Sequence, residues 1–147
     1  MIIDLDKTNP PGWKNDRGPQ MKRFTDWIIY ELHARDFSIA DSSGIKNKGK
    51  YLGFTENNTI SPLSEKTGIS HLKELGITHV HLLPVFDFQS VDEEKPLKKY
   101  NWGYDPQNFN VPEGSYATDP ADGKGRILEL KTAIKALHEA GIRVILD

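Results

Sequence analysis

The sequence has 147 residues, of which 37% are hydrophobic and 27% charged, so it suits one packed domain and not a disordered polyelectrolyte. Nineteen basic and 21 acidic residues give a net charge of −2, which supplies no positive field for a nucleic-acid partner. Cysteine is absent, which excludes disulfides and thiolate metal sites, and no apolar run approaches the ~20 residues of a membrane span. We therefore expect a globular domain with neither a nucleic-acid nor a membrane partner.

Residues 1–23 are polar and punctuated by proline and glycine, as in NPPG and NDRGP. Such dipeptides mark turns and extended chain rather than the interior of an element. The segment is interpreted as a linker from a preceding domain that this chain lacks, with a flexible terminus as the alternative. Its first residues have neither the basic start nor the apolar core of a signal peptide, and the localisation stays open.

Three short apolar runs predict buried strands: residues 27–32 (WIIYEL), 77–83 (ITHVHLL) and 142–147 (IRVILD). Two helical patterns lie between these runs. They end at Gly76 and Gly141, where a glycine suits the residue after a helix. The apolar residues that carry the two patterns recur at helical spacing: Ile69, Leu72 and Leu75, then Ile127, Leu130, Ile134 and Leu137.

The order strand, helix, strand, helix, strand predicts an α/β fold with parallel strands that are covered on both faces. The helix-to-strand joints are one or two residues long, whereas the strand-to-helix segments run over about residues 33–67 and 86–124. Connections of this kind usually take about 2–6 residues, and much longer ones are usually functional. Because ligands bind at the carboxyl ends of strands in such folds, we expect these two segments to form the site.

Aromatic residues are concentrated in the second long segment. The chain has 14 aromatic side chains, and half of them are Phe86, Phe88, Tyr100, Trp102, Tyr104, Phe109 and Tyr116. They occur among Asn, Asp, Pro and Gly rather than at helical spacing. Aromatic faces suit the C–H face of a sugar, and Asn and Asp bind its hydroxyls. The alternative is that the rings pack the segment onto the sheet.

Three polar patterns favour ordinary structural roles. His79 and His81 point to one face of a strand as a metal pair would, but with no third ligand nearby buried histidines are favoured. Gly123-Lys124-Gly125 lacks the rest of a phosphate-binding motif and is interpreted as a turn that opens a helix. Four further carboxylates suit turns, two of them in Asp-Pro pairs: Asp87, Asp92, Asp105 and Asp119.

Asp147 differs from those carboxylates because it ends an apolar strand at the edge where the site is expected. The two alternatives for it are a functional or site-bracing group and a solvated chain end.

Residues 100–106 (YNWGYDP) resemble the signature heptapeptide of type I pullulanases, members of the α-amylase superfamily (glycoside hydrolase family 13). The surrounding segments are similar to the same family. They are residues 29–38 (IYELHARDFS), 48–53 (KGKYLG), 82–88 (LLPVFDF) and 110–116 (NVPEGSY). The resemblance extends from about residue 24 to the end of the chain, and the linker is also pullulanase-like.

The resemblance implies that residues 24–147 are the N-terminal part of a (β/α)8 catalytic barrel: a partial TIM barrel with three parallel strands and two crossover helices. Family members cleave α-1,6 linkages in pullulan, starch and glycogen with retention. By position, Tyr104 resembles the tyrosine that stacks under the sugar, and Asn101, Trp102 and Asp105 resemble its neighbours. Asp147 resembles the first residue of the family's region I.

The family's nucleophile and acid/base lie on later strands, so the resemblance implies no catalytic residue before position 147. The chain is then expected to be inactive alone and to lack the C-terminal strands of the barrel. The resemblance implies an α-glucan as ligand and no cofactor here, and it leaves calcium binding by the full-length parent open. The alternatives are another enzyme of the superfamily, such as a glycogen debranching or branching enzyme, and a non-catalytic glucan-binding module.

Overall fold

The computed structural model of the protein describes residues 2–95 and 99–147. Its centre is a parallel three-stranded sheet in the order β1-β2-β5, made of β1 (Ile29–Leu32), β2 (His79–Leu82) and β5 (Arg143–Leu146). The parallel strands with a helix in each connection confirm the predicted α/β class. The strands are shorter than predicted. In residues 27–32, for example, the Ile28 amide donates to the Thr78 hydroxyl and not to a backbone carbonyl of the neighbouring strand.

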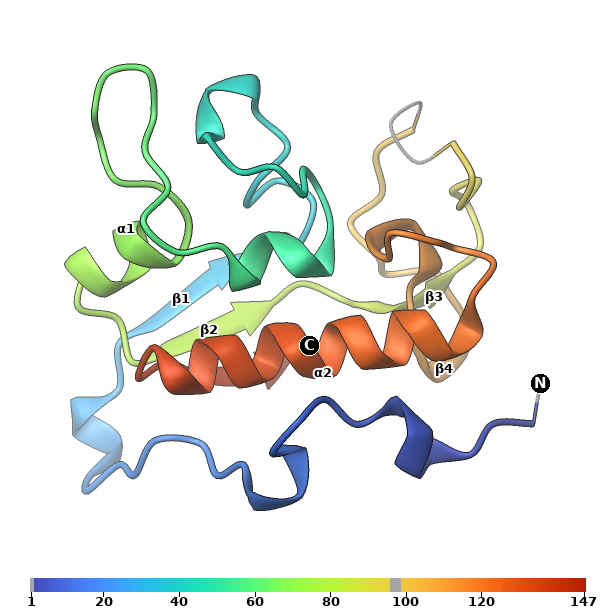
Figure 1. Ribbon diagram of the computed structural model, residues 1–147, viewed down its shortest axis with the longest axis horizontal. Helices are drawn as coiled ribbons and strands as arrows, with labels where there is room; N and C mark the ends of the chain where they lie inside the picture. Colours follow the sequence, from blue (N-terminus) through green and yellow to red (C-terminus); the bar gives the residue numbers. More distant parts are fainter. Residues whose placement is uncertain (1, 96–98) are drawn as a thin grey trace.

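Two α-helices form the crossovers, α1 (Gly68–Glu74) before β2 and α2 (Gly123–Glu139) before β5 (Figure 1). The predicted glycine stops are confirmed, because Gly76 and Gly141 have φ of 68° and 85°, which glycine adopts without strain. The expected turn at the start of α2 is an N-cap, in which Asp122 accepts from the Lys124 amide at 2.9 Å. Local sequence therefore determines where both helices end.

The hydrophobic core lies between the sheet and the two helices. Side chains of α1, α2 and the buried face of β2 meet there, among them Ile69, Leu72, Val80, Leu82, Leu130 and Leu137. Ile127 and Ile134 of the predicted helix face are only half-buried. The core also holds Tyr51 and Phe54 from the first long segment.

The prediction that all three strands are buried is wrong for β1, and no residue of β5 is fully buried. The Ile29 and Tyr30 side chains of β1 are 50% and 41% exposed, whereas Val80 of β2 is fully buried. β1 and β5 are the two edges of the sheet, and among the described residues no further strand pairs with either of them. Burial therefore follows position in the sheet rather than the apolar sequence of a strand.

An antiparallel pair within the second long segment was not predicted. It consists of β3 (Phe86–Phe88) and β4 (Pro106–Pro112), with irregular register on both sides of Asp87. The sequence of β4 is rich in proline and asparagine, which are rare in strands, so it does not predict one. Residues 96–98 of this segment lie outside those that the structure describes. Within the described residues, the long segments and their approach also contain the 3-10 turns η3 (Phe24–Asp26), η4 (Asp41–Ser43), η5 (Tyr51–Thr55) and η7 (Gly114–Tyr116).

The N-terminal segment runs along α2 (Figure 1, blue) and contains the 3-10 turns η1 (Leu5–Thr8) and η2 (Trp13–Asn15). Lys131 of α2 donates to the Thr8 hydroxyl at 3.0 Å, and His138 lies 2.7 Å from the Asp16 carboxylate. These contacts attach the segment to the domain, while its role as a linker stays a prediction. None of the described helices has the length and hydropathy needed to cross a membrane.

Candidate functional site

The two long segments rise from the carboxyl ends of β1 and β2 and meet each other (Figure 1). His33, which follows β1, lies with its Nε2 2.8 Å from the Asn101 carbonyl oxygen, and its ring stacks on Tyr100 at 5.0 Å. Lys50 of the first segment donates to the Ser115 carbonyl of the second at 2.8 Å. The structure thus places both segments at one edge of the sheet, as the loop lengths predicted.

Asn101 organises the turn that carries the heptapeptide. Its amide nitrogen lies 2.7 Å from the Ser90 hydroxyl and 2.6 Å from the Asp105 carboxylate, and its amide oxygen accepts from the Gly103 nitrogen at 2.8 Å. These bonds fold residues 101–105 into a fixed turn. Asn101 is therefore engaged by protein groups rather than free to bind a ligand.

Gly103 lets this turn pass close to the end of β2. Its φ is 95°, and a Cβ at this position would lie 2.7 Å from the Pro84 carbonyl oxygen. Any other residue would meet both a conformational penalty and a backbone clash. The glycine in the heptapeptide is explained by this close approach.

Asp105 is also part of the turn. Hydrogen bonds from the side chains of Ser90 and Asn101 lower its pKa, so its carboxylate is ionised at neutral pH. An ionised carboxylate only accepts hydrogen bonds, which suits its contact with the Asn101 amide. Asp105 therefore braces the turn from an exposed position.

The aromatic residues of the second segment divide into two groups. Phe88 and Tyr116 are buried and Phe86 is half-buried, which agrees with the packing alternative for these rings. Tyr100, Phe109, Trp102 and Tyr104 are exposed, the last two by 61% and 58%. All three aromatic residues of the heptapeptide are thus exposed, and Trp102 and Tyr104 are the most open to solvent.

Tyr104 is anchored by the residue that ends the third strand. Its hydroxyl donates to the Asp147 carboxylate, and this bond raises the pKa of Tyr104 to about 12. Asp147 is itself held by its backbone amide, which donates to the Leu82 carbonyl at 3.1 Å. A strand-end carboxylate therefore fixes an aromatic ring from a distant segment, a pairing that the sequence did not show.

The two histidines of β2 share a face but have different partners. His81 lies between carboxylates, with Nδ1 3.7 Å from Glu31 and Nε2 3.9 Å from Asp147. His79 is buried, packs against Trp27 with the ring centroids 4.5 Å apart, and lies 2.8 Å from the Thr78 hydroxyl. Burial, with a smaller effect of Arg143, lowers the pKa of His79. Among the described residues neither histidine belongs to a group of three metal-ligating side chains.

One acidic cluster has the composition of a cation site and already contains an arginine. Asp87, Glu93 and Glu113 lie together, and Arg126 binds both oxygens of Glu93 at 2.9 and 2.8 Å and lies 3.6 Å from Asp87. Burial raises the pKa of Glu113, whose carboxylate accepts from the Phe88 and Ser115 amides. Arg126 therefore supplies one positive charge to this cluster, directed mainly at Glu93.

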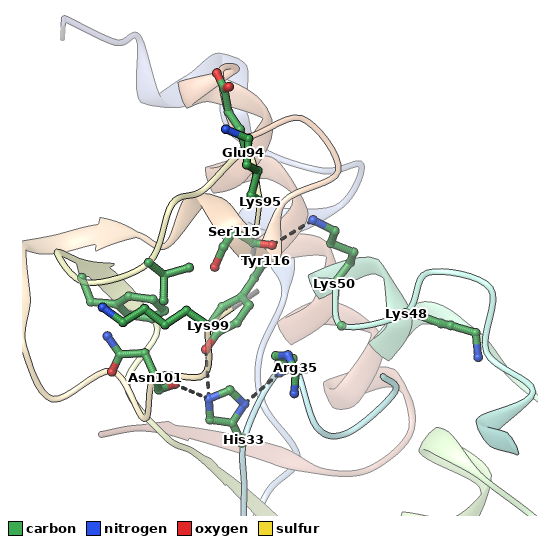
Figure 2. Close-up of a pocket in the computed structure, with 13 residues that line it drawn as sticks. His33, Arg35, Lys48, Lys50, Glu94, Lys95, Lys99, Asn101, Ser115 and Tyr116 are labelled. Atoms are coloured by element: carbon green, nitrogen blue, oxygen red, sulfur yellow. Dashed lines mark hydrogen bonds between the residues drawn. The ribbon is translucent and has the colours of Figure 1, made fainter. Parts of the chain in front are cut away.

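A cavity of about 320 Å³ lies between the two segments (Figure 2). Phe88, Val91 and Tyr116 form its apolar part, and the Tyr116 hydroxyl lies 3.2 Å from His33. Two of the cationic residues that line it are held by protein groups. Lys50 donates to Ser115 and has a pKa lowered by burial, and Arg35 pairs with Asp36 at 2.7 Å.

Sequence reasoning did not identify this cavity. The charged residues that follow β1 directly, His33 and Arg35, were the available signal. Tyr104 and Asp147 do not line it and lie on the open surface instead.

The chain was compared with known proteins. No family model matches it. It is 57% identical over 122 residues to the pullulanase of Bacillus subtilis strain 168, which covers 83% of this chain and 17% of that protein. Isoamylase 3 of rice is 36% identical over 152 residues, covering 95% of this chain and 17% of that protein.

Solved structures give the same result. The pullulanase of Paenibacillus barengoltzii, crystallised with maltohexaose and α-cyclodextrin, superposes with a TM-score of 0.95 at 56% identity. The match covers 99% of this chain and 23% of that protein. By sequence and by fold, this chain is similar to these pullulanases, and it spans about a fifth of their length.

Proposed function

We propose that residues 24–147 are the N-terminal part of the (β/α)8 catalytic barrel of a starch-debranching glycoside hydrolase that cleaves α-1,6 linkages in pullulan, starch or glycogen. Three parallel strands with helices on one face are the repeating unit of such a barrel. The other face carries Glu31, His81 and Ile145, and in a closed barrel this face points inward. Further strands beyond residue 147 would cover it, and residues 1–23 would connect it to a preceding domain.

The observation that carries this proposal is the exposed ring of Tyr104, held at the carboxyl edge of the sheet by Asp147. A fixed aromatic face binds the apolar C–H face of a sugar with little loss of conformational entropy. Trp102 is exposed on the same turn and would extend the contact along the glucan. Asn101 and Asp105 would act by shaping the turn, and Asp147 by bracing Tyr104.

Cleavage itself would need groups that this part of the protein does not offer. A retaining glycosidase uses two carboxyl groups about 5–5.5 Å apart, one as the nucleophile and one as the acid/base. Asp105 and Asp147 are the carboxylates of the proposed sugar surface, and both are engaged by protein side chains. The catalytic pair would then lie beyond residue 147, and the chain alone would release no maltotriose from pullulan.

Titration of the chain with maltotetraose, followed by tryptophan emission, tests the sugar surface. We expect saturable binding that Tyr104→Ala and Trp102→Ala weaken. Binding to Trp102→Ala is followed by NMR, because this substitution removes one of the emitting tryptophans. Phe109→Ala is the matched control, since Phe109 is equally exposed but lies on β4. Absence of binding, or equal weakening by all three substitutions, would refute the proposed surface.

The similarity to isoamylase 3 favours one further candidate, a debranching enzyme of isoamylase type. Activity of the full-length protein on pullulan separates the two candidates, because the pullulanase-like function requires it. A glucan-binding module without catalysis is the candidate from another class. It predicts tight maltotetraose binding by the chain and no hydrolysis of pullulan or glycogen by the full-length protein.

A further inference from the structure

Two carboxylates and an imidazole form a row across the open face of the sheet. Glu31 of β1, His81 of β2 and Asp147 after β5 follow one another, with the imidazole between the two carboxylates. Glu31 is paired with His81 in the strand register, and His81 with Ile145. Because side chains alternate along a strand, Asp147 points to the same face as Ile145 two residues earlier. Register therefore brings the three groups together.

The imidazole has one nitrogen for each carboxylate. Its Nδ1 lies 3.7 Å from Glu31 and its Nε2 3.9 Å from Asp147. Both distances are longer than a hydrogen bond, so the imidazole acts on the two carboxylates through charge when it is protonated. The second oxygen of Asp147 accepts the Tyr104 hydroxyl. Asp147 is thus held between a strand side chain and the tyrosine of a distant turn.

Tyr104 depends on this anchor for its orientation. The ring is 58% exposed, and among the described residues no other aromatic ring packs against it. An exposed side chain with a single polar anchor keeps one rotamer only while that anchor is fixed. The position of the Asp147 carboxylate therefore determines where the ring lies.

We propose that His81, supported by Glu31, is a positioning residue that orients the Asp147 carboxylate and through it the sugar-binding ring of Tyr104. The part of this inference that concerns sugar rests on the proposed function. The orientation of Tyr104 itself does not rest on it, so the two can fail separately. Neither His81 nor Glu31 touches the glucan in this arrangement.

The test is NMR of the chain with ¹³Cζ-labelled tyrosine. Tyr104→Phe assigns the Tyr104 signal, and Asp147→Asn defines its position without the carboxylate. We expect His81→Gln to move the signal most of the way to the Asp147→Asn position, and Glu31→Gln to move it less. His71→Gln, on the exposed side of α1, is the matched control and leaves the signal unchanged.

A double-mutant cycle separates positioning from a general structural role. If His81 acts through Asp147, His81→Gln produces no further shift in the Asp147→Asn background. An equal shift in both backgrounds, or no shift in the wild-type background, overturns the proposal. Should His81→Gln prevent folding, as judged by the amide spectrum, Glu31→Gln carries the same cycle, because the Glu31 side chain is 61% exposed and tolerates substitution.

Addition of maltotetraose connects the two proposals. We expect the sugar to perturb the Tyr104 signal and His81→Gln to raise the dissociation constant about two- to fivefold, as for the loss of one partly exposed charge contact. If the sugar leaves the signal unchanged while His81→Gln still moves it, the positioning role stands and the sugar-binding proposal fails. If the sugar binds and His81→Gln leaves the Tyr104 signal unchanged, the sugar-binding proposal stands and the positioning role fails.

Discussion

Gly103→Ala tests whether the heptapeptide turn depends on its close approach to the end of β2. The substitution introduces a Cβ 2.7 Å from the Pro84 carbonyl oxygen and 2.9 Å from the Pro84 Cβ, at a φ of 95°. An L-residue in the left-handed region costs about 1–2 kcal/mol. The overlap with Pro84 then forces the turn or the proline to move, which adds about 1–3 kcal/mol as in other overpacked sites.

Gly141→Ala is the matched control for the conformational part of this cost. Gly141 has a similar φ of 85°, but a Cβ there meets nothing within 4 Å. Urea unfolding should give a loss of about 1–2 kcal/mol for Gly141→Ala and about 2–5 kcal/mol for Gly103→Ala. Because Gly103 carries Tyr104 next to it, maltotetraose binding should fall in Gly103→Ala and not in Gly141→Ala. Equal losses of stability and unchanged binding in both variants would show that the approach to Pro84 does not determine the turn.

Three further outcomes follow from the same contacts. Tyr104 should titrate near pH 12 by tyrosinate absorbance, and Asp147→Asn should return its pKa to about 10. The bond to Asp147 stabilises the fold fully below pH 10, and this stabilisation is lost as the pH rises through 12. If Tyr104 of the unaltered chain titrates together with the ordinary exposed tyrosines, the anchor is contradicted. Arg126→Met should lower the free energy of unfolding in urea by about 3 kcal/mol, because it leaves the Asp87, Glu93 and Glu113 carboxylates together without a cation. The control Lys95→Met removes one partner of an exposed ion pair and should lower it by less than about 1 kcal/mol. The chain alone should associate with increasing concentration in sedimentation experiments, because β1 and β5 are unpaired edges within the described residues; a reversible, monomeric thermal transition would contradict this.

The division among the aromatic residues shows how one segment serves two purposes. Phe88 and Tyr116 enter the core and attach the segment to the sheet, and Tyr116 also contacts His33 of the other long segment. Trp102 and Tyr104 are left on the surface by the turn that Asn101 and Gly103 form. Composition indicated a sugar surface or a packing role as alternatives; the structure confirms packing for the buried rings, and the sugar surface stays a proposal for the exposed ones.

Local patterns in the sequence were sufficient for the secondary structure and its order. The apolar runs, the helical spacing and the stops at Gly76 and Gly141 each depend on residues within about one turn or one strand, so they can be read without the fold. The same holds for the heptapeptide, whose residues are contiguous. The positions of Tyr104 and Asp147 as candidate site residues came from resemblance and from the end of a strand, not from their contact.

The tertiary structure alone decided which of these residues meet. The bond between Tyr104 and Asp147 spans 43 positions, and the row of Glu31, His81 and Asp147 exists only because three parallel strands share a register. The exposure of β1 likewise depends on what lies beside it in the sheet, which its apolar sequence does not encode. Hydrophobic periodicity and glycine stops depend on neighbours along the chain, so they could be predicted from the sequence. Contacts between distant segments depend on chain topology and strand register, so they could not.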